Sequence, residues 1–105
     1  MAKATELARI CQVLSAETRV RIVELLRTSA LCVGAIAERL GVSQAAISQH
    51  LRVLRDAGLV VPDKRGYYVH YRLEPRSLAR WRSALDQLLA PGEEKPCPRA
   101  RRKEE

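Results

Sequence analysis

Hydrophobic positions in the first half of the chain recur every three or four residues, separated by polar and charged positions. Four segments show this spacing: residues 4–14, Ala16–Arg27, Val33–Leu40 and 44–57. In the last of them Ile47, Leu51 and Leu54 fall at i, i+4 and i+7, which places them on one face of a helix. The pattern therefore predicts four consecutive helices, each with one buried face.

After Gly58 the helical spacing gives way to the pattern of a β-hairpin. The sequence LVVPDKRGYYVHYRL predicts a strand near Leu59–Val61, a polar turn around Asp63–Gly66 and a second strand Tyr67–Leu73. Alternate residues of a strand share a face, so Tyr67 and Tyr71 are expected to pack in the hairpin core.

The last apolar pattern covers Pro75–Ala90, where Pro75 suits the first turn of a helix. Its apolar stripe consists of Leu78, Trp81, Leu85, Leu88 and Leu89. From Pro91 onward the sequence is rich in proline and in mixed charge, which is typical of a segment without fixed structure. We therefore predict one folded domain, residues 1–90, followed by a flexible charged tail, residues 91–105.

The predicted fold class is mainly α with a β-hairpin, in the order α-α-α-α-β-β-α. The first and last helices both carry an apolar stripe beyond what the central helices need. Two such helices can form a symmetric dimer face, and a chain of 105 residues buries only a modest core by itself. A homodimer through the first and last helices is the prediction, and completion of a monomer core is the alternative.

Helices 33–40 and 44–57 are close enough in sequence to form a helix-turn-helix pair. Gly41 tolerates a positive φ angle, and Ser43 is a good N-cap for the second helix. The outward face of the second helix carries amide, hydroxyl and guanidinium groups: Gln44, Ser48, Gln49, Arg52 and Arg55. Gln and Ser can bond base edges, and Arg binds phosphate or guanine. No acid lies between Gln44 and Arg55, which favours DNA binding over the alternative of an ordinary solvated helix face.

The charge of the chain fits a nucleic-acid partner. The net charge is +7 at pH 7, and residues 91–105 nearly balance their basic and acidic residues, so most of the excess lies on residues 1–90. A basic domain attracts polyanions, although charge alone names no partner. No apolar run approaches the about 20 residues of a membrane helix, and the first residues lack the apolar stretch of a signal peptide. We therefore expect a cytoplasmic protein without a membrane partner.

Three cysteines, Cys11, Cys32 and Cys97, are spread along the chain. An odd number without a CxxC motif argues against a disulfide framework. No cluster of Cys and His occurs along the sequence, so a shared thiol site has to be assembled by folding or by dimerisation. An enzyme is not expected, because there is no glycine-rich phosphate loop, no His near a candidate nucleophile and no pair of carboxylates in an apolar context.

Three stretches make the chain resemble the ArsR/SmtB family of small winged-helix repressors. They are LSAETRVRIVELL, LGVSQAAISQHLRVLRDAGLV and KRGYYVHYRL, and the resemblance covers roughly residues 6–90. It implies a winged helix-turn-helix fold and a homodimer that represses transcription from double-stranded DNA with an inverted-repeat operator. The two recognition helices would then enter successive major grooves.

The resemblance also implies roles for particular side chains. Base contacts are expected from Gln44, Ser48 and Gln49. Phosphate contacts are expected from Ser43, His50, Arg52 and Arg55, with Lys64 and Arg65 of the wing reaching the backbone or minor groove. For His50 the alternative is that the ring packs or caps within the protein.

The inducer-binding motif of the family is only partly present. Many metal-sensing members carry ELCVCDL at the start of the third helix, where this chain has Cys32 but Gly34 and Ala35 at the second Cys and the Asp. A two-thiolate site from this motif is therefore excluded. The zinc-type site of the last helix is not expected either, because Pro75–Ala90 contains no His.

The remaining soft ligands are the thiols of Cys11, Cys32 and Cys97, which suit trivalent arsenic or antimony. We therefore expect As(III) as the inducer, bound by these three thiols, and no organic cofactor. Two alternatives stay open. One is a repressor that senses thiol oxidation or reactive sulfur, and the other is an architectural DNA-binding protein without an inducer.

Overall fold

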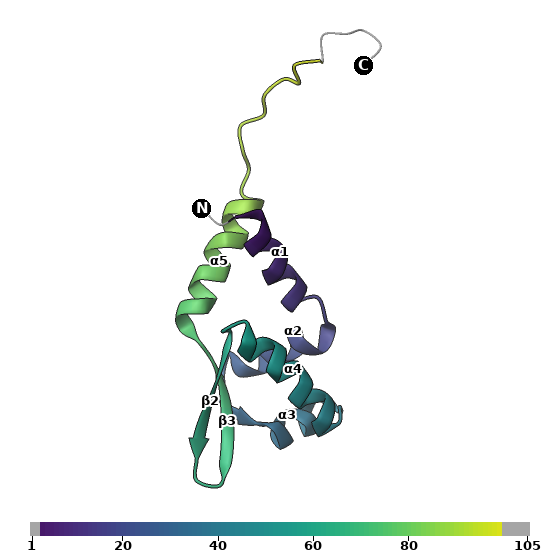
Figure 1. Ribbon diagram of the computed structural model, residues 1–105, viewed down its shortest axis with the longest axis vertical. Helices are drawn as coiled ribbons and strands as arrows, with labels where there is room; N and C mark the ends of the chain where they lie inside the picture. The colour runs from purple at the N-terminus through teal and green to yellow at the C-terminus, as the bar shows by residue number, and fades with distance from the viewer. Residues whose placement is uncertain (1–2, 100–105) are drawn as a thin grey trace.

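The computed structural model describes residues 3–99 and orders eight elements along the chain (Figure 1). They are α1 (Ala4–Val13), α2 (Glu17–Leu26), β1 (Leu31–Cys32), α3 (Val33–Leu40), α4 (Gln44–Asp56), β2 (Val60–Arg65), β3 (Tyr68–Leu73) and α5 (Pro75–Leu89). Helices α1 and α5 lie side by side at one end, and α3, α4 and the hairpin form the other end. The predicted winged helix-turn-helix fold is confirmed.

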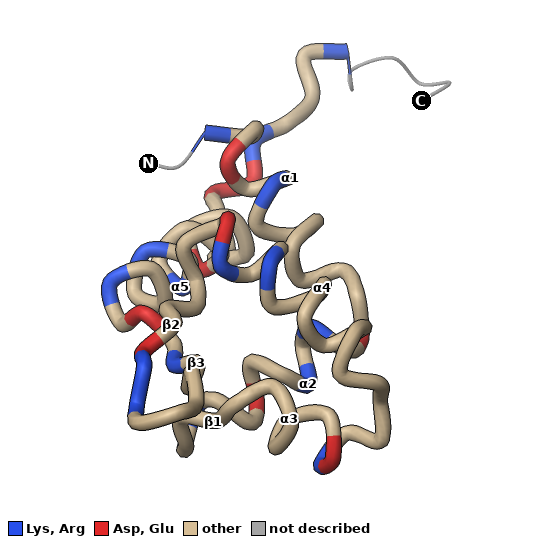
Figure 2. The backbone as a smooth tube through the Cα atoms, turned by 60° about the horizontal axis from the view of Figure 1, so that its bottom comes forward, with Lys and Arg blue, Asp and Glu red and all other residues tan. Residues whose placement is uncertain are grey.

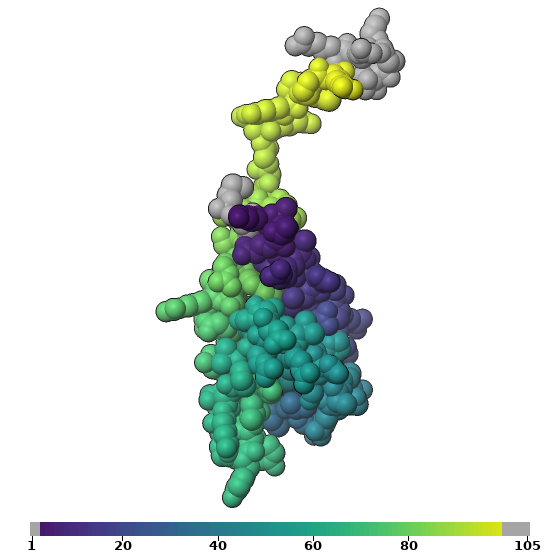
Figure 3. Space-filling view, in the orientation of Figure 1, coloured from purple at the N-terminus to yellow at the C-terminus, as the bar shows by residue number. Residues whose placement is uncertain are grey.

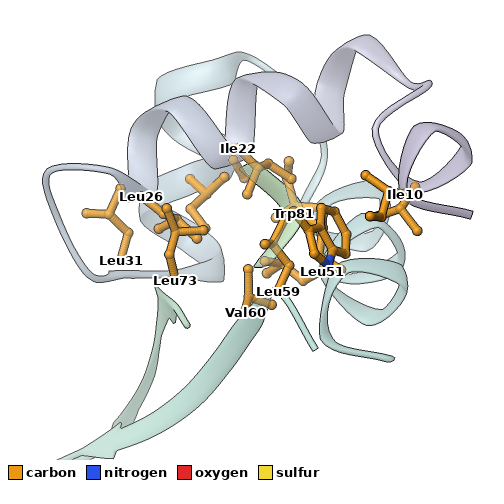
Figure 4. Packing of buried hydrophobic residues seen from close by; sticks show 14 of the residues in the cluster. Ile10, Ile22, Leu26, Leu31, Leu51, Leu59, Val60, Leu73 and Trp81 are labelled. Atoms are coloured by element: carbon orange, nitrogen blue, oxygen red, sulfur yellow. The ribbon is translucent and has the colours of Figure 1, made fainter. Parts of the chain in front are cut away.

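One apolar core joins both ends of the molecule. Ile22 of α2, Ile36 of α3 and Ile47 of α4 are completely buried, and they hold the three central helices together. Trp81 of α5 and Ile10 of α1 extend the same cluster toward the helical end (Figure 4). The periodic apolar positions of the sequence thus supply one continuous core.

The sheet has three strands in the order β1-β3-β2, all antiparallel. The sequence did not predict β1, because two residues are too short to show an alternation. Leu31 pairs with Tyr71 and Cys32 pairs with His70. Pairing with β1 makes β3 the central strand and leaves β2 at an edge, where Pro62 is tolerated because an edge strand can spare one donor.

The predicted hairpin turn was misplaced. Strand β2 continues to Arg65, which pairs with Tyr68, so Asp63 and Lys64 lie in the strand and not in the turn. The chain reverses at Gly66 and Tyr67, where Gly66 has φ +64°. A glycine with positive φ matches the twist of a two-residue hairpin turn, whereas polar composition alone does not exclude a solvated edge strand.

This shift of the turn places Tyr67, but not Tyr71, outside the hairpin core. Tyr67 is 100% exposed at the tip, so its predicted place in the hairpin core was wrong. Tyr71 is partly buried and packs against the core, as expected. The hairpin tip therefore projects away from the body of the protein (Figure 3).

The ends of the last helix are also defined. Glu74 caps α5 by accepting a hydrogen bond from the backbone N–H of Arg76, and the buried Ser77 hydroxyl donates to the carbonyl of Gly58 at 2.7 Å. Residues 91–99 follow α5 as an exposed segment without helix or strand, and the rest of the predicted tail lies outside the described residues. Within residues 3–99 no helix combines the length and apolar character needed to cross a membrane.

Two glycines of the helix-turn-helix give a matched test of this geometry. Gly41 ends α3 with φ +66°, so Gly41→Ala should lower the free energy of unfolding by about 1–2 kcal/mol. Gly34 lies inside α3, where a Cβ would meet only the Gln44 amide at 3.6 Å, so Gly34→Ala should raise stability by about 0.5 kcal/mol. Urea denaturation of the two variants measures both changes, and equal effects would contradict the assigned backbone.

Candidate DNA interface

The first turn of α4 is fixed by its N-cap. The hydroxyl of Ser43 accepts a hydrogen bond from the backbone N–H of Ala46 at 3.1 Å, which satisfies one of the free donors at the helix start. Ile47, Leu51 and Leu54 are at most 1% exposed and hold one face of α4 against the core. The opposite face must therefore point to solvent.

The predicted base- and phosphate-contacting side chains lie on that solvent face. The exposed residues are Ser43, Gln44, Ser48, Gln49, Arg52 and Arg55. Arg55 also approaches Asp56, the next residue, at 3.9 Å, but both side chains are solvated and such a pair contributes little. The side chains of this face remain free to meet a ligand.

A hollow between α4 and the sheet continues this surface. It is lined by Ser48, Leu51, Arg52 and Arg55 from α4 and by Tyr71 from β3. The sequence placed Tyr71 only in the hairpin core and did not connect it with the helix. Tyr71 therefore borders the same hollow as α4, a proximity that no local sequence pattern reveals.

The wing adds basic side chains close to the tip. Lys64 and Arg65 are exposed on β2. Figure 2 shows a basic stretch of backbone beside the β2 label. The guanidinium of Arg65 donates to the carboxylate of Asp63 at 3.4 Å, on the same edge strand. Part of the charge of Arg65 is therefore balanced within the wing. Lys64 forms no ion pair with another residue of the described range 3–99.

His50 is placed differently from its neighbours on α4. The side chain is half-buried, and its Nδ1 lies 3.2 Å from a guanidinium nitrogen of Arg19 on α2. Burial, and secondarily the charge of Arg19, lower the pKa of His50 from its ordinary value of 6.5. The ring is therefore neutral at pH 7, and Nδ1 accepts from Arg19. No local sequence pattern connects Arg19 with His50, because 31 residues separate them.

The three cysteines lie on different parts of the chain. Cys11 is exposed on α1, Cys32 is half-buried where β1 meets α3, and Cys97 is exposed beyond α5. In the described part of the chain, no group of three or more Cys, His, Asp or Glu side chains is gathered closely enough to hold a metal ion. One subunit in this conformation therefore does not bring the three thiols together.

Cys32 instead has neighbours across the sheet. It pairs with His70 of β3, which also pairs with Asp63 of β2, so the three side chains share one face. This face is opposite to the one that buries Leu31 and Leu73. The Nδ1 atom of His70 is buried without a hydrogen-bond partner among the described residues.

Comparison with known proteins assigns the chain to a family. Residues 16–61 match the family model described as bacterial regulatory protein, arsR family. The HTH-type transcriptional regulator Rv2034 of Mycobacterium tuberculosis is 44% identical over 80 residues, which are 76% of this chain and 75% of that protein. The arsenical resistance operon repressor of Escherichia coli is 39% identical over 88 residues, which are 83% of this chain and 75% of the repressor.

Solved structures agree with this assignment. A crystal structure of a possible transcriptional regulator for arsenical resistance is 41% identical, with a TM-score of 0.71, over 78% of this chain and 85% of that one. The homodimeric winged helix-turn-helix DNA-binding domain Mb0332 of Mycobacterium bovis is 25% identical, with a TM-score of 0.64, over 91% of this chain and 100% of that one. The chain therefore belongs to the arsR family, and it is a DNA-binding transcriptional repressor and not an enzyme.

Proposed function

We propose that two copies of this chain bind an inverted-repeat operator, with α4 of each copy in the major groove. The observation that carries this proposal is the solvent face of α4, which presents amides, hydroxyls and guanidinium groups and no acid from Gln44 to Arg55. A helix of this composition fits the width and the hydrogen-bonding groups of the major groove. The adjacent wing adds basic side chains that can follow the backbone of the same duplex.

The apolar surface of α5 supports the dimer. A groove between α2 and α5 is lined mainly by Leu14, Val23, Leu59, Leu78, Trp81, Leu85 and Leu89. Leu88 and Leu89 are 55% and 76% exposed in the single chain. A second copy can cover such a patch symmetrically, and the description of Mb0332 as homodimeric supports the same arrangement here.

Within this complex each exposed group has a proposed role. Gln44, Ser48 and Gln49 contact base edges, and Arg52 and Arg55 bind phosphates on either side. Lys64 and Arg65 reach the backbone or the minor groove from the wing. The two copies of α4 would enter major grooves about one helical turn apart.

For the inducer we propose a soft, thiol-binding species, As(III) or Sb(III), with Cys11, Cys32 and Cys97 as its ligands. The three free thiols support this choice, as do the two relatives named for arsenical resistance. Because Cys11 lies on α1 and Cys32 lies where β1 meets α3, one subunit does not gather these thiols, and a complete site requires ligands from the second copy. Oxidants and reactive sulfur species are the competing inducers.

The base-reading role is tested by one pair of variants. Gln49→Ala should weaken binding to the operator, selected from a random-sequence library, by about 1–3 kcal/mol and leave binding to random duplex unchanged. Arg52→Gln should weaken both and reduce the salt slope by about one. Fluorescence anisotropy at several salt concentrations measures these effects. Equal losses of Gln49→Ala on both duplexes would remove Gln49 from base recognition, and no operator preference in the parent protein would favour an architectural DNA binder.

Ser43 combines a cap with a proposed phosphate contact, and two substitutions separate these roles. Ser43→Ala should cost about 1 kcal/mol of stability through loss of the cap, whereas Ser43→Asp should keep the cap. The added charge of Ser43→Asp should weaken DNA binding by repulsion. Thermal unfolding and anisotropy together measure both roles. A Ser43→Asp protein with undiminished DNA affinity would place Ser43 away from the phosphates.

The inducer proposal is tested at Cys32 and Gly34. Cys32→Ser should raise the arsenite concentration needed to release DNA by roughly tenfold or more. Gly34→Cys adds a thiol two residues away in a place where a Cβ is tolerated, so it should lower that concentration, and Gly34→Ser is the control of equal size. Anisotropy titrations with arsenite, hydrogen peroxide and sodium polysulfide provide the measurement. Release by the latter two alone would replace As(III) by a redox or sulfur inducer.

A further inference from the structure

One guanidinium group joins three helices of this protein. Arg19 of α2 donates from Nε to the carbonyl of Val13 at 2.6 Å and from Nη2 to the carbonyl of Gln12 at 3.3 Å. Its third contact is with Nδ1 of His50 on α4, at 3.2 Å. Arg19 therefore connects the end of α1 with the middle of the recognition helix.

The contacts of Arg19 with α1 stabilise the C-terminal end of that helix. The last carbonyls of a helix have no partner inside the helix, and a cation near them is favoured by the helix dipole. Gln12 and Val13 belong to this last turn of α1. Arg19 therefore provides hydrogen-bond donors for the last carbonyls of α1, and it fixes the direction of α1 relative to α2.

The contact with His50 links two parts of the molecule that pack on different neighbours. Helix α1 packs mainly on α5, whereas α4 packs on α2, α3 and β2 (Figure 1). A planar guanidinium with donors on both sides can hold two such elements in one geometry. The half-buried imidazole provides the acceptor on the α4 side.

We propose that Arg19 and His50 are a positioning pair that sets the recognition helix relative to α1. This inference rests on the proposed dimer, because α1 then belongs to the dimer face and its angle to α4 sets the separation of the two recognition helices. His50 acts in this pair as a neutral acceptor from Arg19 and does not grip a phosphate. Arg19 and His50 thus control which half-site spacing the dimer can match.

The two roles of His50 have opposite pH dependence. Burial is the main cause that lowers the pKa of His50, and Arg19 is the charged group that adds to it. Helix α1 presents only the carbonyls of Gln12 and Val13 to this guanidinium. Protonation of His50 at a pH below its lowered pKa removes the acceptor at Nδ1 and places two cations together. For a positioning pair operator affinity then falls with pH, whereas for a phosphate contact it rises, because imidazolium binds phosphate better than imidazole.

The first experiment measures operator binding of the full chain at pH 7.5 and pH 5.5 in constant salt. The parent protein should bind about five- to tenfold more weakly at pH 5.5. His50→Gln keeps an acceptor that does not titrate, so the pH effect should vanish, and His70→Asn should leave it in place as the control for the second histidine. Tighter binding at pH 5.5, or the same pH effect in His50→Gln, would overturn the proposal.

The second experiment varies the operator. Duplexes with half-sites moved apart or together by one or two base pairs should be strongly discriminated by the parent protein. Arg19→Met should flatten this preference, and Arg19→Lys should restore part of it because the charge near the end of α1 is kept. An unchanged spacing preference in a folded Arg19→Met protein would contradict the positioning role.

A third measurement needs no DNA and therefore separates this inference from the proposed operator. Nitrogen NMR of the imidazole rings in the free protein should show His50 with its proton on Nε2 and with a pKa below 6.5. Arg19→Met should raise that pKa. If the free protein shows this pairing but no inverted repeat is selected, the dimeric operator is wrong and the contact stands. A His50 pKa that is indifferent to Arg19 would refute the pair itself.

Discussion

The burial of one face of α4 is the constraint on which the DNA surface depends. Ile47, Leu51 and Leu54 are nearly inaccessible, and Ile22 and Ile36 supply the fully buried surface from α2 and α3. A helix with this spacing can bury only one stripe, so the rotation of α4 about its axis is fixed by the core. The polar side chains on the opposite face of α4 then point to solvent, and no additional interaction is needed to place them there. The interface is therefore a direct consequence of the packing.

Apolar packing sets the rotation of α4 but does not by itself set how α4 is oriented toward a second subunit. In the proposed dimer that orientation depends on α1, and hydrophobic contacts are not directional. Hydrogen bonds from a planar guanidinium are directional, and those of Arg19 reach both α1 and α4. The core therefore determines which face of α4 is exposed. We propose that the hydrogen bonds of Arg19 determine how that face is oriented toward the second subunit.

The sequence predicts those features whose signal is periodic and long. The helices and the exposed face of α4 follow from spacing at 3.6 residues, and the structure moves the helix ends by at most one residue. The sequence did not predict the features that depend on contacts between distant segments. Strand β1 has two residues and exists because β3 pairs with it, and the turn at Gly66 was hidden by polar residues that an edge strand tolerates. The contact between Arg19 and His50 joins distant positions and leaves no local pattern.

The same geometry explains why two of the three thiols are better placed than the third to influence DNA binding. Cys32 directly precedes α3, which packs on α4, and it pairs with His70 of the strand that leads directly into α5. Cys11 precedes Gln12, whose carbonyl accepts from the Arg19 guanidinium that also reaches His50. An inducer changes the equilibrium between two arrangements of a protein only if it binds them with different affinity. The residues that bind the inducer must therefore lie where the two arrangements differ. Of the thiols in the proposed inducer site, Cys32 adjoins α3 and Cys11 adjoins the Arg19 contacts, so both are connected with α4 through neighbouring residues. Cys97 is exposed beyond α5, and within residues 3–99 no hydrogen bond connects it with α4.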